Sequence, residues 1–446
     1  MSGPLQWPLF TGPLPVTLLA SGAAGAAFLI FRRRRRWLIS VLPLITGGSA
    51  LATLLIAWVV NALWRPFPDP LPAAVFVWVA VILGAMALGV AHFRSARWLR
   101  RVTATIAVVA VLAAGANQIN RFFGYYPTPA ALLGLPLPQE RPLPAIQRAG
   151  VHLGHRPPSS VLAQTWRPPV GMPTVGAVSH VAVPGVRSGF RARPAWLYLP
   201  PAYLTDSRPN LPVLMLIVGQ PGTSRDWIDA GHVITIMDLF AAAHHGLAPI
   251  VVMPDPLGST MANPLCANTS LGNVDTYLAE DVPTWVSANL QVDPDTRHWA
   301  VGGFSYGGTC SLQLSVNHPR LFPTFLDISG QDAPTLGSRQ RTLDRAFGGD
   351  ARAFAHINPL DILSTLPRNR LNPMGRSDFS TVAGTLAVGS RDAVFASQQH
   401  HVQAVAVKAG MSIGWLEVPG GHSWHVAVAA LRQALPWLST RMGLTR

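Results

Sequence analysis

Charged side chains are scarce in this sequence of 446 residues. Asp, Glu, Lys and Arg together make up 12% of the chain, about half of the roughly 25% that is usual in a soluble domain. Hydrophobic residues make up 49%, and the mean hydropathy is +0.29. A disordered chain is polar and rich in charge, so this composition excludes one.

Acidic residues are scarcest in the first quarter of the chain. Residues 1–126 contain 11 arginines but a single acid, Asp69, which gives them a net charge of +10. Residues 127–446 carry the remaining +4 of the formal +14. A pI near 11.2 would suggest a nucleic-acid partner, but most of the basic charge lies among long apolar stretches. We therefore expect no nucleic-acid binding and interpret these arginines as determinants of membrane topology.

Four stretches without a charged side chain are long enough to cross a bilayer, which takes roughly 20 helical residues. Arginine-rich loops at 32–36 and 94–101 separate the first stretch from the second and the third from the fourth. Because Lys and Arg concentrate in cytoplasmic loops, we expect both loops inside, and the N-terminus and everything after about residue 121 outside. A cleaved signal peptide would carry its positive charge before the apolar stretch, whereas here the charge follows it. The four stretches cover approximately 14–31, 37–64, 72–93 and 102–120.

The segment 125–177 is rich in proline. Eleven prolines between Tyr125 and Pro173 disfavour long helices and inner strands and favour an extended backbone. The sequence therefore predicts a four-span transmembrane anchor over 1–124, a linker over 125–177 and a C-terminal domain over 178–446.

Beyond residue 175, short apolar runs alternate with amphipathic stretches. Continuous apolar strands that alternate with helices are typical of a mostly parallel, doubly wound α/β sheet covered on both faces. We expect strands at 195–199, 213–218, 249–253, 298–302, 324–328, 385–388 and 414–418, and helices at 233–244, 275–289, 306–318, 396–409 and 424–437.

A serine follows the strand predicted at 298–302, within the sequence Gly303-Phe304-Ser305-Tyr306-Gly307. In this G-x-S-x-G pattern the serine occupies a strained turn between a strand and a helix, with its hydroxyl exposed. The start of the following helix supplies free N–H groups and a positive dipole end. We therefore predict Ser305 as a nucleophile.

A nucleophilic serine needs a base and a carboxylate that orients the base. Asp392 follows the strand predicted at 385–388, and His422 follows the next strand. Because chemistry in open α/β sheets collects at the carboxyl ends of the strands, Ser305, Asp392 and His422 are predicted to form a triad. His425 is the alternative base, and Asp361 and Asp378 are alternative acids that no predicted strand precedes.

Acyl chemistry also needs N–H donors for a developing oxyanion. One is expected from the residue after the nucleophile, Tyr306. The other is expected from Gln220, in the loop that follows the strand predicted at 213–218. Its neighbour Pro221 has no N–H to offer.

Cysteine is almost absent, with only Cys266 and Cys310 in the chain. Both fall in the domain expected outside, where an oxidising environment permits a disulfide; two buried free thiols are the alternative. The histidine pairs at 244–245 and 400–401 lack the spacing and the cysteine companions of metal ligands. We expect no metal and no other cofactor.

On these residues the C-terminal domain resembles the esterase family of α/β-hydrolases, which includes feruloyl-type esterases and the antigen 85 mycolyltransferases. The resemblance covers roughly 178–440, and the four-span anchor is similar to that of actinobacterial membrane-bound esterase-like proteins. It implies an α/β-hydrolase fold, a nucleophile at Ser305, a base at His422 and a carboxylate that varies between branches: antigen 85 enzymes use Glu, whereas this chain offers Asp392. The resemblance rests on residues 195–203, the Gly219-Gln220 loop, the pattern around Ser305 and Gly421-His422-Ser423-Trp424.

Three functions remain open from the sequence. The first is a membrane-anchored serine esterase that acts outside the cytoplasmic membrane on a lipid or cell-envelope ester. The second is an acyltransferase that moves acyl groups between envelope glycolipids through the same acyl-enzyme on Ser305. The third is a non-catalytic envelope binding protein. For both enzymes the expected partners are the lipid bilayer and a lipid or glycolipid ester.

Overall fold

The computed structural model describes residues 3–67, 69–93, 98–143, 161–365 and 379–446. The chain divides into two compact units, Met1–Leu135 and Pro136–Arg446. The segment predicted as a linker is thus shared between the units. Its described residues after Pro136 pack within the second unit, because the N–H of Arg141 donates to the carbonyl oxygen of Val178 at 2.8 Å. Residues 144–160 of that segment lie outside the described residues.

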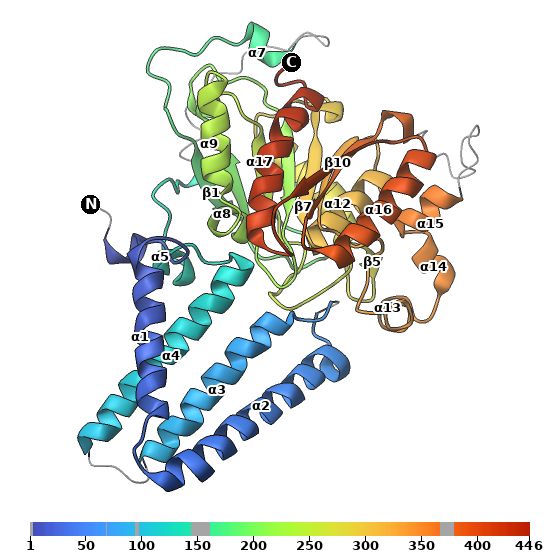
Figure 1. Cartoon of the computed structure of the whole chain (residues 1–446). Helices are drawn as coiled ribbons and strands as arrows, with labels where there is room; N and C mark the ends of the chain where they lie inside the picture. Colours follow the sequence, from blue (N-terminus) through green and yellow to red (C-terminus); the bar gives the residue numbers. More distant parts are fainter. Residues whose placement is uncertain (1–2, 68, 94–97, 144–160, 366–378) are drawn as a thin grey trace. The chain divides into compact units, whose positions relative to one another are not determined.

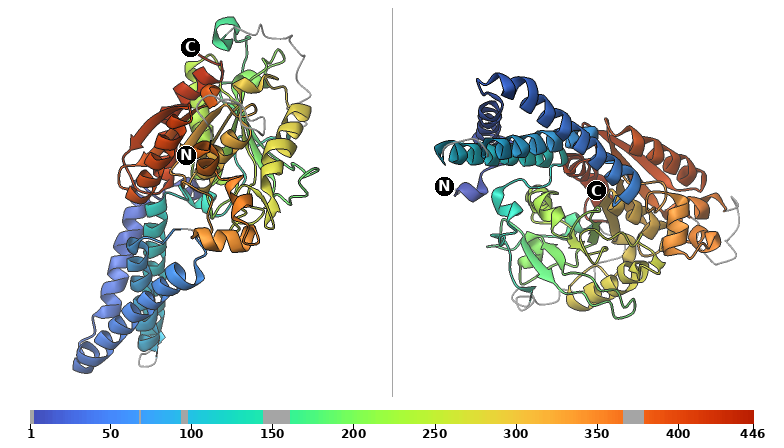
Figure 2. Two further views of the ribbon diagram at one scale, coloured as in Figure 1. Left: turned by 90° about the vertical axis from the view of Figure 1, so that its right-hand side faces the viewer. Right: turned by 90° about the horizontal axis from the view of Figure 1, so that it is seen from below.

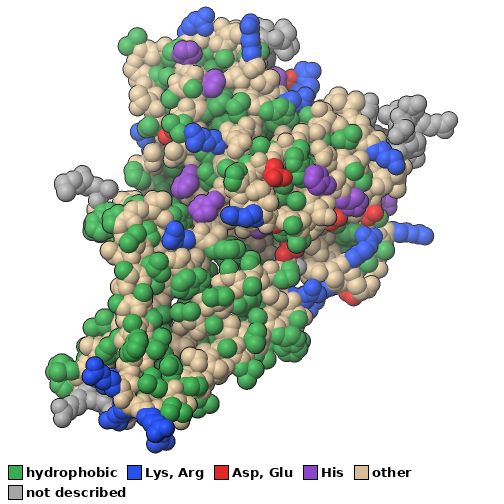
Figure 3. All heavy atoms as spheres, viewed as in Figure 1, with side chains coloured by type: hydrophobic (Ala, Val, Ile, Leu, Met, Phe, Trp, Pro, Cys, Tyr) green, Lys and Arg blue, Asp and Glu red, His purple; other side chains and the backbone are tan. Residues whose placement is uncertain are grey.

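The first unit is built on four long apolar helices, as the sequence predicts. Each is long and apolar enough to cross a membrane, and hydrophobic side chains cover their flanks (Figure 3). Most of each span is not buried within the unit, which is typical of helices that face lipid. The elements are α1 (Pro13–Ile30), the continuous run of η2 (Trp37–Val41), α2 (Leu42–Trp58) and η3 (Val59–Trp64), then α3 (Ala73–Phe93) and α4 (Trp98–Phe123), with the short η1 (Pro4–Gln6) and α5 (Pro129–Leu132).

These helices pack in the order α1, α4, α3 and α2. Small residues allow α1 and α4 to approach closely, and Gly22 lies against Ala114. His92, near the end of α3, is fully buried, and its Nε2 lies 3.1 Å from the carbonyl oxygen of Leu29 at the end of α1. The end of α1, which leads into the arginine run 32–36, is therefore fixed against the end of α3.

The second unit contains an eight-stranded sheet in the order β1-β2-β4-β3-β7-β8-β9-β10. Strand β2 runs antiparallel to both of its neighbours, and all the other pairs are parallel. Helices lie on both faces of this sheet (Figures 1 and 2), so the predicted doubly wound, mostly parallel α/β architecture is confirmed. The strands are β1 (Ala177–Val181), β2 (Ala195–Leu199), β3 (Val213–Ile217), β4 (Ile250–Met253), β7 (Ala300–Phe304), β8 (Thr324–Ile328), β9 (Ala383–Gly389) and β10 (Ser412–Val418); β5 (Asn268–Thr269) pairs with β6 (Gly272–Asn273) apart from the main sheet.

The five helices predicted for this domain correspond to α9, the run from α10 to α11, α12, α16 and α17. The sequence did not predict α13, α14 and α15, which have only eight, five and six residues and therefore show no sustained helical period. The helices of the unit are α7 (Leu162–Thr165), α8 (Asp226–Asp229), α9 (Val233–Ala243), α10 (Val274–Thr276), α11 (Val282–Asn289), α12 (Tyr306–Asn317), α13 (Arg339–Ala346), α14 (Ala351–Ala355), α15 (Pro359–Ser364), α16 (Ala393–Lys408) and α17 (Trp424–Arg441), with shorter turns η4 (Pro201–Leu204), η5 (Tyr277–Asp281), η6 (Thr296–His298) and η7 (Phe379–Thr381).

The strand before the predicted nucleophile begins two residues later than expected. The sequence predicted 298–302, whereas β7 spans Ala300–Phe304. The reason is the 3₁₀ turn η6, which Asp295 caps by accepting a hydrogen bond from the N–H of Arg297 at 3.0 Å. Strand β7 therefore runs up to the residue directly before Ser305.

Candidate active site

Ser305 lies in the turn between β7 and α12. Its φ is +57°, a value that residues other than glycine rarely adopt. Its N–H donates to the carbonyl oxygen of Ile328 on β8 at 2.8 Å, and its own carbonyl oxygen accepts from Thr309 at 3.1 Å. Gly307 is needed for packing, because a Cβ there would clash with the carbonyl oxygen of Ile217 on β3. The G-x-S-x-G pattern thus forms the strained strand-to-helix turn that it predicts.

The side chains of Ser305, His422 and Asp392 form a continuous chain of hydrogen bonds. Nε2 of His422 lies 2.9 Å from Oγ of Ser305, and Nδ1 lies 2.9 Å from Oδ2 of Asp392. With the proton on Nδ1, the imidazole donates to the carboxylate and leaves Nε2 free to accept the hydroxyl proton of Ser305. The structure thus brings together the three residues that the sequence predicts as a triad.

Two adjacent parallel strands position the acid and the base. Asp392 follows β9 and begins α16, while His422 follows β10, which pairs with β9 along its whole length. The side chain of Asp392 is only 8% exposed, whereas that of His422 is 29% exposed. The carboxylate is therefore shielded from water, and the imidazole stays open toward an incoming substrate.

Two phenylalanine rings stack on the imidazole of His422, a feature that the sequence analysis did not predict. The ring of Phe304 has its centre 4.9 Å from that of the imidazole, and the ring of Phe395 has its centre 4.1 Å away. Both interplanar angles are below 30°. Phe304 ends β7 and Phe395 lies in the first turn of α16, so the elements that carry Ser305 and Asp392 also orient the base. In the sequence, the position of Phe304 directly before the nucleophile in the G-x-S-x-G pattern was the only local indication that one of these rings lies near the base.

The loop after β3 lies beside the nucleophile. A Cβ on Gly219 would lie 3.4 Å from Cβ of Ser305, which places the next residue, Gln220, close to the serine. Tyr306 is the first residue of α12, a position whose N–H has no acceptor within the helix. The backbone N–H groups of Gln220 and Tyr306 stay our predicted donors to an oxyanion.

An ion pair with a buried carboxylate holds this loop in place. The carboxylate of Asp255 is fully buried and accepts from Nε and Nη2 of Arg193 at 2.9 and 2.7 Å. Nη2 of Arg193 also donates to the carbonyl oxygen of Gly222 at 2.9 Å. Because Arg193 and Asp255 are 62 residues apart, no local sequence pattern indicated this pair, which positions the segment after Gln220.

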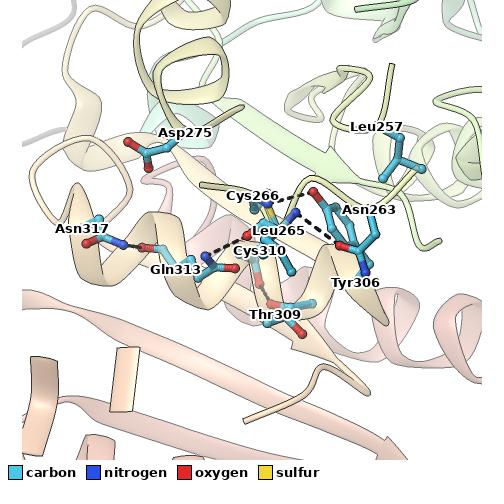
Figure 4. Close-up of a disulfide and its surroundings, with 12 residues drawn as sticks. Leu257, Asn263, Leu265, Cys266, Asp275, Tyr306, Thr309, Cys310, Gln313 and Asn317 are labelled. Carbon is cyan, nitrogen blue, oxygen red and sulfur yellow. Dashed lines mark hydrogen bonds between the residues drawn. A yellow bond between two sulfur atoms is a disulfide. The ribbon is translucent and has the colours of Figure 1, made fainter. Parts of the chain in front are cut away.

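A disulfide connects helix α12 to the loop after β4 (Figure 4). The structure pairs Cys266 of the loop with Cys310 of the helix. The N–H of Cys266 also donates to the hydroxyl oxygen of Tyr306 at 2.9 Å, and Nε2 of Gln313 donates to the carbonyl oxygen of Leu265 at 3.0 Å. The loop is thus attached at three positions to the helix that begins directly after the nucleophile.

The alternative site residues lie elsewhere or cannot be placed. His425 is exposed on α17, and it is His422 whose Nε2 lies 2.9 Å from Oγ of Ser305. Asp361 accepts a hydrogen bond from Nδ2 of Asn358 at 2.9 Å at the start of α15, which is a structural role. Asp378 lies outside the described residues. Within the described part of the chain, no three His, Cys, Asp or Glu side chains are grouped so that they could hold a metal ion.

Comparison with known sequences identifies the family. The model of the esterase family matches residues 191–438, more than half of the chain. An uncharacterised protein of Corynebacterium glutamicum is 37% identical over 427 residues, which cover 95% of this chain and 94% of that protein. The chain belongs to the esterase family. The resemblance predicted from the sequence is confirmed, and this esterase-family protein is a serine hydrolase or acyltransferase.

Solved structures share the fold of this esterase-family protein. A ferulic acid esterase is 18% identical and matches over 61% of this chain and 100% of its own, with a TM-score of 0.51. MPT51 of Mycobacterium tuberculosis is 17% identical over 59% of this chain and 97% of its own, with a TM-score of 0.43. The match to the ferulic acid esterase confirms the predicted α/β-hydrolase fold of the C-terminal domain.

Removal of the disulfide from this esterase-family protein is expected to destabilise the second unit. Cys266 and Cys310 are 44 residues apart, and closing a loop of this length in the unfolded chain stabilises the fold by about 4 kcal/mol. The double substitution Cys266→Ala/Cys310→Ala should lower the free energy of unfolding by that order, as measured by urea unfolding of the full chain in detergent. Wild-type protein treated with a reductant should lose the same amount, and the double variant should not respond to the reductant. Equal stability of oxidised and reduced wild type would contradict the prediction.

Asp327 is expected to make the stability of the protein depend on pH. This residue of β8 is fully buried behind the nucleophile turn, and burial raises its pKa to about 7. Hydrogen bonds from the N–H of Gly330, which lies 2.9 Å from Oδ1, and from the side chain of Gln399 lower the pKa and so oppose the effect of burial. Burial is the larger effect, so the folded state favours the neutral acid.

The direction of this pH dependence follows from the raised pKa. The unfolded chain ionises Asp327 near pH 4, but the folded chain ionises it only near pH 7. Stability is therefore expected to fall as the pH rises between these values, and the loss is complete above about pH 7. Thermal unfolding at pH 5 and pH 8 should show a smaller drop for Asp327→Asn than for wild type. A drop of the same size in both proteins would assign the effect to other groups.

Proposed function

We propose that this protein is a membrane-anchored serine esterase that acts outside the cytoplasmic membrane on a lipid or cell-envelope ester. The observation that carries the proposal is the chain of two 2.9 Å hydrogen bonds from Ser305 through His422 to Asp392. It lies at the carboxyl ends of β7, β9 and β10, where chemistry on such sheets takes place.

The geometry supports a two-step acyl transfer. Oγ of Ser305 attacks the ester carbonyl carbon while Nε2 of His422 takes its proton, and Asp392 stabilises the imidazolium that forms. The N–H groups of Tyr306 and Gln220 stabilise the negative oxygen of the tetrahedral intermediate. Nε2 then returns the proton to the leaving alkoxide, which departs as the alcohol and leaves an acyl-enzyme. In the second step, His422 activates water, and the acid is released.

Two independent features support an external active site. The arginine-rich loops 32–36 and 94–101 are expected to stay in the cytoplasm, which puts the segment after α4 on the opposite side. The pairing of Cys266 with Cys310 fits the same side, because disulfides persist in oxidising compartments. Four helices long enough to span the membrane would then hold the hydrolase next to lipid esters.

A membrane-impermeant fluorophosphonate probe tests the nucleophile and its side of the membrane together. Intact cells that express the full chain should be labelled as strongly as lysed cells, and Ser305→Ala should remove the label. Labelling only after lysis would overturn the external location, and labelling that survives Ser305→Ala would overturn the assignment of the nucleophile.

The substrate class needs a separate measurement. The full chain in lipid nanodiscs should hydrolyse a bilayer-embedded long-chain ester with a higher kcat/KM than a short water-soluble ester, and mass spectrometry should detect the free acid. Preference for the soluble ester would overturn the lipid assignment. Formation of acylated trehalose in place of free acid, when trehalose is supplied, would identify an acyltransferase, since both reactions share the same acyl-enzyme.

A further inference from the structure

The first unit contains a cavity at the end of the helices where the arginine run 32–36 lies. The cavity has a volume of about 560 Å³. Its lining is divided between guanidinium groups and apolar side chains that come from η2, α2 and α3. Arginine side chains gather at this end of the helices next to hydrophobic ones (Figure 3). The lining residues are Arg32, Arg34 and Arg36 on the cationic side, with Trp37, Val41, Ile45, Ala87, Val90 and Ala91.

Part of this lining is held in a fixed arrangement. Trp37 is only 4% exposed, and its Nε1 donates to the carbonyl oxygen of Ile30 at 2.9 Å. Arg32 is 7% exposed, and its guanidinium carbon lies 5.0 Å from the centre of the Trp37 ring, within the range of a cation–π contact. Trp37 also meets the buried His92 edge-on, with ring centres 4.8 Å apart. A buried arginine in such a setting differs from the solvated arginines of an ordinary topology loop.

The charge of the cavity is positive and is not offset by a nearby carboxylate of this unit. Burial and the positive charges of Arg100 and Arg34 lower the pKa of Arg32. The single acid of residues 1–126 is Asp69, in the loop between η3 and α3. Helix α3 rises about 20 Å between its first turn and Ala87, so Asp69 lies at the opposite end of α3 from the cavity. An anion in the cavity would therefore relieve the mutual repulsion of the arginines.

We propose that this cavity binds the phosphate group of an anionic membrane phospholipid. Guanidinium groups match phosphate oxygens with paired hydrogen bonds, and Arg34 and Arg36 are the exposed arginines of the cavity. The apolar wall of Val41, Ile45 and Val90 fits the start of an acyl chain, which free phosphate does not have. The cavity also lies at the ends of membrane-length helices, the level at which phospholipid phosphates are found.

The run itself provides a matched control. Arg33 and Arg35 are exposed and do not line the cavity, whereas Arg34 and Arg36 do. The double variants Arg34→Gln/Arg36→Gln and Arg33→Gln/Arg35→Gln remove the same charge from the same loop, so membrane orientation and overall attraction to anionic lipid change equally. Any difference between the two variants must come from the cavity.

Native mass spectrometry of the full chain in detergent, titrated with dioleoylphosphatidylglycerol or dioleoylphosphatidylcholine, tests the proposal. Wild type and Arg33→Gln/Arg35→Gln should retain one tightly bound phosphatidylglycerol, and Arg34→Gln/Arg36→Gln should bind it about tenfold more weakly or worse. Phosphatidylcholine should bind weakly to all three proteins. Equal loss in both double variants, or loss in neither, would overturn the proposal.

Two further measurements separate a lipid from free phosphate. Ala87→Phe fills the apolar wall and keeps every arginine, so it should weaken phosphatidylglycerol binding. Inorganic phosphate at millimolar concentration should not displace the bound lipid from wild type. Full displacement by phosphate, together with unchanged lipid binding by Ala87→Phe, would reassign the cavity to a free anion.

Discussion

Replacement of Ser305 by alanine is expected to lower kcat for ester hydrolysis by about 10⁵-fold or more, because members of such a triad act as a unit. The hydroxyl of Ser305 lies 2.9 Å from Nε2 of His422 and is the attacking atom in the proposed mechanism. Alanine keeps the backbone turn but has no nucleophile. The activity that remains should come from binding and from the oxyanion donors alone.

The rate should be measured with a short chromogenic ester, so that access to the bilayer does not limit it. Ser311→Ala is the matched control, because Ser311 lies six residues after Ser305 on α12, and its hydroxyl donates to backbone carbonyl oxygens, including that of Gly308 at 2.7 Å. This variant should retain wild-type activity apart from any loss of stability. Comparable rates for Ser305→Ala and wild type would show that another residue is the nucleophile.

The second large effect is expected from Asp392→Asn, which should lower kcat by about 10⁴-fold. The carboxylate accepts the Nδ1 proton of His422 at 2.9 Å and so fixes the tautomer in which Nε2 can act as a base. The side-chain amide of the Asp392→Asn variant can instead donate to Nδ1 of His422. The imidazole proton then lies on Nε2, which can no longer accept the proton of Ser305. Its size is almost unchanged, so the fold and the affinity of the protein for substrate should be preserved.

A second carboxylate–histidine pair in this domain gives a control for Asp392→Asn. Asp293 accepts from Nδ1 of His298 at 2.7 Å, and its side chain is 7% exposed, close to the 8% of Asp392. This pair precedes β7 and therefore lies at the opposite edge of the sheet from Ser305. Asp293→Asn should leave kcat unchanged at a temperature at which both variants are folded. A similar loss of kcat in the two variants would mean that Asp392 acts only through stability.

The sequence was sufficient to predict features that depend on residues close together in the chain. Helix α9 and strand β8 were predicted to within one residue, because their apolar patterns are strong and local. The candidate triad could be proposed because each member directly follows a strand, and the ends of parallel strands meet at one edge. The nucleophile turn was visible because a serine at φ +57° needs small neighbours at fixed spacing.

Features that depend on contacts between distant residues were missed. Strand β1 is the edge strand of the sheet, and its pairing with β2 depends on the fold as a whole. The Arg193–Asp255 pair and the packing of Phe395 on His422 each join segments that no sequence period relates. The division of the proline-rich segment between two units was missed for the same reason, since the hydrogen bond from Arg141 to Val178 joins residues 37 positions apart in the printed sequence.

The two phenylalanine rings beside His422 have a consequence for the energetics of the reaction. In the proposed mechanism the imidazole becomes a cation when it takes the proton of Ser305. An aromatic face attracts a cation through its quadrupole, by roughly 0.5–2 kcal/mol according to burial. Phe304 and Phe395 therefore bind the charged base more strongly than the neutral one. Stabilisation that grows as the reaction proceeds lowers the barrier, whereas equal stabilisation of both states would not. In the proposed mechanism, part of the preference for the transition state thus comes from two hydrocarbon rings.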